Sequence, residues 1–157
     1  MRLAFRIKHY FFNAFRELFV HHHGSLEFRA KIFALVISAN KKVNIQNYIL
    51  VKDLALEIYN NDEDRANLLL LSTKELVNKI KDPNSSLSID SLILGLQKEL
   101  KIVPRYAKKI DIDALKRFLD LADSDDTYSF QENILEFLEK LKNETLKIQP
   151  KKEIQKD

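Results

Sequence analysis

The scarcity of glycine and proline is the feature that most limits how this chain can fold. The 157 residues contain two glycines and three prolines. Sheet proteins need both residue types in their many turns, whereas long helices are joined by few, polar connections. With 45% hydrophobic residues, the chain also has enough apolar material for one core. We therefore expect an all-α protein built as a single helical bundle.

Apolar periodicity and capping residues divide the chain into seven expected helices. Asparagine, aspartate and serine precede most of the periodic segments, and these residues cap helix N-termini. The expected helices span residues 2–20, 26–39, 45–59, 62–80, 89–100, 111–123 and 129–142, with Asn44, Asp62, Ser88 and either Asp111 or Asp113 as caps. Ser129 and Glu132 have the spacing of a capping box for the last helix. Residues 21–25, three histidines followed by Gly-Ser, form an expected turn.

Two short segments repeat at an offset of 85 residues. Residues 44–50 (NIQNYIL) and 129–135 (SFQENIL) share the order cap, apolar, Gln, polar, any, Ile, Leu. Each copy follows an apolar helix that ends in Ala-Asn or Ala-Asp. The pattern predicts two helix–turn–helix hairpins that pair their apolar faces, with Ile49 and Ile134 at equivalent buried positions. Chance similarity between short helical segments is the alternative.

The expected helix over residues 2–20 has an unusually wide apolar surface. At 100° per residue its apolar arc covers roughly 220°, whereas a surface helix needs about 100°. The residues expected to meet a partner or a membrane are Arg2, Phe5, Arg6, Phe12, Arg16 and Phe19. Three alternatives remain for what buries this face. They are the domain of the same chain, a membrane interface with anionic headgroups, and a homodimer or the groove of a partner.

Charge is unevenly distributed along the chain. Residues 1–52 carry nine Lys/Arg against two Asp/Glu, and residues 53–149 carry fourteen against nineteen. A basic N-terminal segment followed by an acidic remainder predicts an anionic partner for the basic segment, such as a membrane surface. The alternative is that these charges serve only to keep the protein soluble. No apolar run reaches the ~18–20 residues of a membrane span, and no signal-peptide pattern is present. We expect a cytoplasmic protein, with peripheral attachment at the inner face of the membrane as an option.

Three regions follow from these patterns. Residues 1–25 form the basic amphipathic helix and His-rich turn, residues 26–145 form the bundle, and residues 146–157 form a basic disordered tail or linker.

The second copy of the repeat resembles the TerB family of tellurite-resistance domains. Residues 118–132 (FLDLADSDDTYSFQE) combine an apolar helix ending in Ala-Asp, an acidic turn and a Glu-containing cap. The first copy departs from the family, with Asn40, Lys41 and Asn47 where Asp, Gly and Glu are usual. The resemblance covers about residues 26–142. It implies about seven helices and a role in stress response, membrane-linked complexes or co-chaperone function, as in the TerB-like domain before the J domain of DjlA-type DnaJ proteins.

The acidic turn is a candidate cation site. Asp123, Asp125, Asp126 and Glu132 offer carboxylates with a spacing similar to that of a Ca²⁺ loop, although the central glycine of an EF-hand is missing. The alternative is helix capping and compensation of the helix dipole, since these carboxylates flank a helix N-terminus.

No nucleophile motif, glycine-rich phosphate loop or base-reading basic helix is found, and the chain has no cysteine. We therefore expect a non-enzymatic protein-interaction module that needs no cofactor and does not bind nucleic acid. A regulatory domain that binds a divalent cation through residues 120–132 is the alternative.

Overall fold

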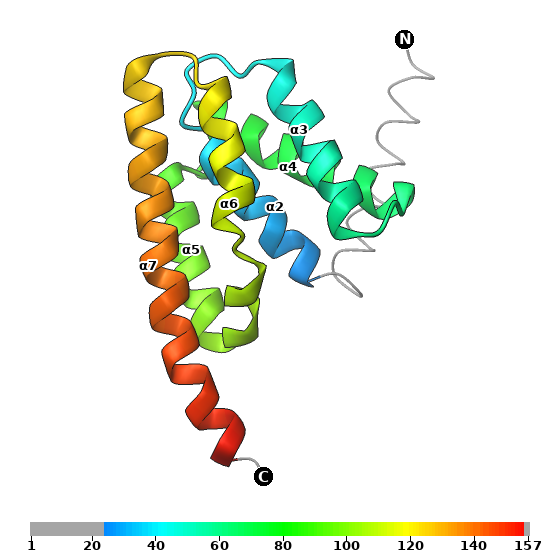
Figure 1. Cartoon of the computed structure of the whole chain (residues 1–157). Helices are drawn as coiled ribbons and strands as arrows, with labels where there is room; N and C mark the ends of the chain where they lie inside the picture. The colour runs from blue at the N-terminus through cyan, green and yellow to red at the C-terminus, as the bar shows by residue number, and fades with distance from the viewer. Residues whose placement is uncertain (1–23, 156–157) are drawn as a thin grey trace.

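The computed structural model describes residues 24–155, with side chains to residue 148, so the helix expected over residues 2–20 lies outside the described residues. The described elements are α2 (Gly24–Ile37), α3 (Ile45–Ile58), α4 (Glu63–Lys81), α5 (Ile89–Ile102), the 3-10 helix η1 (Pro104–Lys109), α6 (Ile112–Lys116), the 3-10 helix η2 (Arg117–Leu121) and α7 (Asp125–Gln155). This part of the chain is helical and contains no strand (Figure 1). The prediction of an all-α bundle is confirmed.

Helix α2 lies at the centre of the bundle. Its sequence is apolar on nearly every side, and most of its residues are buried, including Phe28 and Phe33. It contacts α4, α5, α7 and η1. The Phe28 ring lies 5.3 Å from that of Tyr106, and the Phe33 ring lies 5.7 Å from that of Phe118, measured between ring centroids. These aromatic contacts fix the later segments of the chain onto α2.

The prediction of a turn over residues 21–25 is wrong at its C-terminal end, because α2 begins at Gly24. A Cβ atom at position 24 would lie 2.5 Å from the hydroxyl oxygen of Tyr106. Gly24 therefore allows the close approach of Tyr106 to the first turn of α2.

The predicted caps of four helices are confirmed. Asn44 accepts from the Gln46 N–H at 2.9 Å, Asp62 from the Arg65 N–H at 3.2 Å, Ser88 from the Ser91 N–H at 3.1 Å, and Asp111 from the Ala114 N–H at 3.1 Å. Between α3 and α4, Asn60 and Asn61 have φ values of 54° and 65°. Asparagine tolerates this left-handed conformation better than most residues, so the Asn-Asn pair ends α3 where predicted.

The predicted capping box at Ser129 and Glu132 is wrong, because α7 begins at Asp125. The Ser124 hydroxyl oxygen accepts a hydrogen bond from the Thr127 N–H at 3.1 Å and so caps the helix one turn earlier. Both serines precede an apolar-periodic segment. The acidic residues directly after Ser124 suit the positive end of the helix dipole and favour the earlier start.

Helix α7 also ends later than predicted. We expected it to end near Lys142 and to be followed by a disordered tail, but it continues to Gln155 and extends past the other helices (Figure 1). Residues 146–155 are therefore helical. Although α7 has 31 residues, neither it nor any other helix between residues 24 and 155 is long and apolar enough to cross a bilayer.

The two copies of the sequence repeat differ in burial. Ile134 is 5% exposed in the core, whereas Ile49 is 47% exposed on α3, so the prediction that both are buried is wrong. Gln46 is exposed, whereas its counterpart Gln131 is buried and donates a side-chain N–H to the Val36 carbonyl at 2.9 Å. The first copy starts at a helix cap and the second lies inside α7, so the same spacing presents different faces to the core.

Candidate functional site

The turn after α2 and the turn before α7 lie side by side, joined by Asp123. The backbone N–H groups of Lys41 and Lys42 donate to one carboxylate oxygen of Asp123 at 2.8 and 3.0 Å. The Asp123 N–H in turn donates to the side-chain oxygen of Asn40 at 3.0 Å. The Ala-Asn and Ala-Asp endings of the repeat therefore meet in space, and the acidic residue binds the backbone of the opposite turn.

A polar network surrounds this junction. The Thr127 hydroxyl donates to the other carboxylate oxygen of Asp123, and this bond, with the backbone N–H donors, holds the pKa of Asp123 below its ordinary value. Lys81 donates to the carbonyl oxygens of Ser38, at 2.9 Å, and of Asn40. Burial lowers the pKa of Lys81, and the negative charge of Asp123 partly opposes that shift. The junction thus satisfies backbone groups that two helix ends leave without partners.

The four predicted metal ligands do not gather around one point. Asp125 and Asp126 are exposed in the first turn of α7, and Glu132 is exposed further along it. Both carboxylate oxygens of Asp123 already accept hydrogen bonds. In residues 24–148 no three histidine, aspartate or glutamate side chains are placed to hold a metal ion. The geometry fits helix capping, and cation binding stays a prediction.

The six residues predicted to bind a partner or membrane, from Arg2 to Phe19, lie outside the described residues. Their role also stays a prediction.

An apolar groove between α5 and the C-terminal half of α7 was missed by the sequence analysis. We call it the α5–α7 groove; its volume is about 570 Å³. Its lining includes the apolar side chains of Leu94, Leu100, Pro104, Leu141 and Ile148, with Lys98, Lys101 and Glu144. Leu94 and Ile148 are each 57% exposed. One signal was available for Leu94, because the consecutive apolar residues 92–94 cannot all face the core of one helix. Ile148 lies beyond the predicted helix end.

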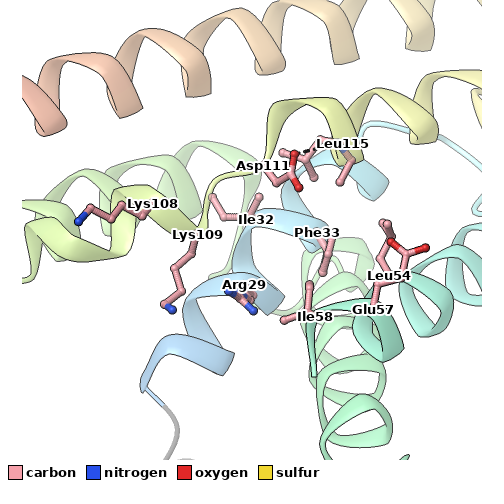
Figure 2. A pocket seen from close by; sticks show the side chains of 11 residues that line it. Arg29, Ile32, Phe33, Leu54, Glu57, Ile58, Lys108, Lys109, Asp111 and Leu115 are labelled. Carbon is pink, nitrogen blue, oxygen red and sulfur yellow. Dashed lines mark hydrogen bonds between the residues drawn. The ribbon is translucent and has the colours of Figure 1, made fainter. Parts of the chain in front are cut away.

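A second cavity, of about 310 Å³, opens between α2, α3 and the segment from η1 to α6 (Figure 2). Apolar side chains, among them Ile32, Phe33 and Leu54, form its inner wall. Charged side chains surround them: Arg29, Glu57, Lys108, Lys109 and Asp111. Lys108 and Lys109 belong to a basic cluster visible in the sequence, whereas the pairing of that cluster with Arg29 depends on the fold.

Comparison with family models, with curated proteins and with solved structures finds no significant match for this chain. The resemblance to TerB therefore stays a hypothesis, and function has to be inferred from the residues themselves.

Proposed function

We propose that this chain is a non-enzymatic protein-interaction module that docks an amphipathic helix of a partner protein in the α5–α7 groove. The groove carries the proposal, because it leaves large apolar side chains from two helices open to water. Burying apolar surface contributes about 25 cal/mol per Å². A partner that buried the exposed side chains of Leu94 and Ile148 would therefore bind favourably. A trough between two helices suits a third helix, whose apolar residues recur every three or four positions.

The charges beside the groove indicate the chemistry of the partner helix. Lys98 and Lys101 lie on the α5 side and are exposed, and neither forms an ion pair within the described residues. The α7 side contributes one carboxylate to the lining, that of Glu144. The excess of positive charge in the lining favours a partner helix whose apolar face is flanked by acidic residues. Complementary charges orient the two molecules and accelerate their association.

Two further parts of the proposal rest on the sequence. The resemblance to TerB favours a role in stress response or in co-chaperone complexes. The basic aromatic pattern of residues 2–20 favours attachment to an anionic membrane surface at the cytoplasmic side. Sedimentation with phosphatidylserine vesicles tests the attachment: Phe12→Asp should abolish binding, while Phe12→Leu should preserve it. Equal binding of both variants, or no vesicle binding by the full chain at any salt concentration, would remove the membrane from the proposal.

Photo-crosslinking in the native host tests the docking site. A photoreactive phenylalanine analogue at Leu94 should trap a discrete protein partner, whereas the same analogue at Asp53, exposed on α3, should not. Peptide mapping of the adduct should place the crosslink on an amphipathic helix with acidic flanks. Adducts of equal yield from both positions, or a crosslink to residues 2–20 of the same chain or of a second copy, would overturn the proposal.

A further inference from the structure

The cavity between α2 and α3 combines an apolar wall with a charged rim. Ile32 and Phe33 from α2 and Leu54 from α3 form the apolar wall. Its volume of about 310 Å³ lies at the lower end of the range of small-ligand sites, about 300–1,000 Å³. The space therefore suits one small organic molecule or the end of a peptide.

The acidic residues of the rim already have partners. Asp111 caps α6 by accepting the Ala114 N–H at 3.1 Å. Glu57 pairs with Arg117 at 3.7 Å. These carboxylates are thus engaged within the protein and attract a ligand cation only weakly.

Arg29 and Lys109, by contrast, have no carboxylate partner in the described part of the chain. Neither Arg29 nor Lys109 forms an ion pair among residues 24–148, and the buried Nε of Arg29 has no hydrogen-bond acceptor there. Figure 2 shows the Lys109 side chain extending toward the end of the cavity where Arg29 lies. Burial, followed by the positive charges of Arg29 and Arg105, lowers the pKa of Lys109. The rim therefore carries a positive charge that the protein itself does not balance.

Arg29 is also held in position. Its guanidinium lies 5.7 Å from the centroid of the Tyr59 ring, within the range of cation–π contacts. An arginine fixed in this way loses little freedom when it binds an oxyanion, which favours tight recognition.

We propose that this cavity binds an organic acid, with the acidic group between Arg29 and Lys109 and an apolar body against Ile32, Phe33 and Leu54. A carboxylate would supply acceptors for the guanidinium and ammonium groups, and charge-assisted hydrogen bonds of this kind are the strong ones. The source of the carboxylate is either a free aliphatic acid or the C-terminus of a peptide. This site is separate from the α5–α7 groove and does not depend on the proposed docking there.

Amide chemical-shift titrations of the full chain test the proposal with three matched probes. Octanoate carries both parts of the expected ligand, octanol lacks the charge and acetate lacks the apolar body. Octanoate should shift amides around the cavity at concentrations about ten-fold or more below those needed for either control. A peptide ending in a free Leu carboxylate, compared with its amidated form, then identifies the source: tighter binding than octanoate would indicate a peptide C-terminus.

A lysine outside the cavity provides the matched control. Lys109→Met should weaken octanoate binding about ten-fold or more, because a charge-assisted contact is lost, and Lys109→Arg should retain it. Lys140→Met removes the same charge from an exposed position on α7 that does not line the cavity, and it should change affinity less than about two-fold. Equal effects of the two methionine variants, or equal affinities for octanoate and octanol, would overturn the proposal. An unchanged amide spectrum of each free variant outside the cavity verifies the fold.

Discussion

Replacing Ile134 by alanine, with Ile49→Ala as the matched control, separates the burial of the two repeat copies. Ile134 is 5% exposed, so the substitution removes three carbon groups from the core at about 0.8 kcal/mol each, and the unfilled cavity adds to this loss. We expect a total loss of about 2–5 kcal/mol in the free energy of unfolding. Ile49 is 47% exposed, so the same change there should cost less than about 1 kcal/mol.

Urea denaturation followed by circular dichroism at the helix band measures both values on one protein. The slope of unfolding free energy against urea should remain the same for both variants, so that the midpoint reports stability. Losses that agree within about 0.5 kcal/mol would show that the two positions are equivalent after all and would refute the assigned register of α7.

Three further expectations concern α7 and the turn that precedes it. Because hydrogen bonds lower the pKa of Asp123 in the folded state, its stabilising contribution should be present above its ordinary pKa of 3.8 and lost as pH falls through the lower folded value. Asp123→Asn should therefore lower the melting temperature at pH 7 and make the melting temperature fall less as the pH is lowered. A dependence of melting temperature on pH identical to that of the parent would contradict this. Asp125→Asn and Asp126→Asn should each change stability by less than about 1 kcal/mol, and millimolar Ca²⁺ should not change the melting temperature of the parent. A Ca²⁺-induced rise that these substitutions abolish would favour the cation-binding alternative. Gln131→Ala should cost about 1–3 kcal/mol in urea unfolding, since the buried Val36 carbonyl loses its donor; a loss below about 0.5 kcal/mol would contradict that role.

Local signals predicted the helices well and their packing less well. Asn44, Asp62 and Ser88 cap helices as expected because capping depends on a few neighbouring residues. The predicted start of α7 was wrong because Ser124 and Ser129 both precede suitable segments. The acidic residues after Ser124 favour the earlier start, and so does the contact between Asp123 and the distant turn at Lys41. That contact joins residues 82 positions apart and has no local signature.

The candidate sites show the same limit. The acidic residue Asp123 was identified from its pattern, but its actual partners are backbone groups of the other turn and the Thr127 hydroxyl. The α5–α7 groove required knowledge of where α7 ends, and the cavity required the approach of Arg29 to Lys109. Such sites arise from pairs of elements, and a single amphipathic pattern does not reveal which pairs meet.

The affinity of the crosslinked partner for groove variants tests the central claim most directly. With the purified partner, isothermal titration calorimetry should give a Kd at least about ten-fold weaker for Leu94→Asp than for the parent chain. Ile49→Asp places the same charge on an exposed apolar position of α3 and should leave the Kd within about two-fold, with both variants retaining the helical spectrum. Equal affinities of the two variants for the partner would contradict docking in the α5–α7 groove.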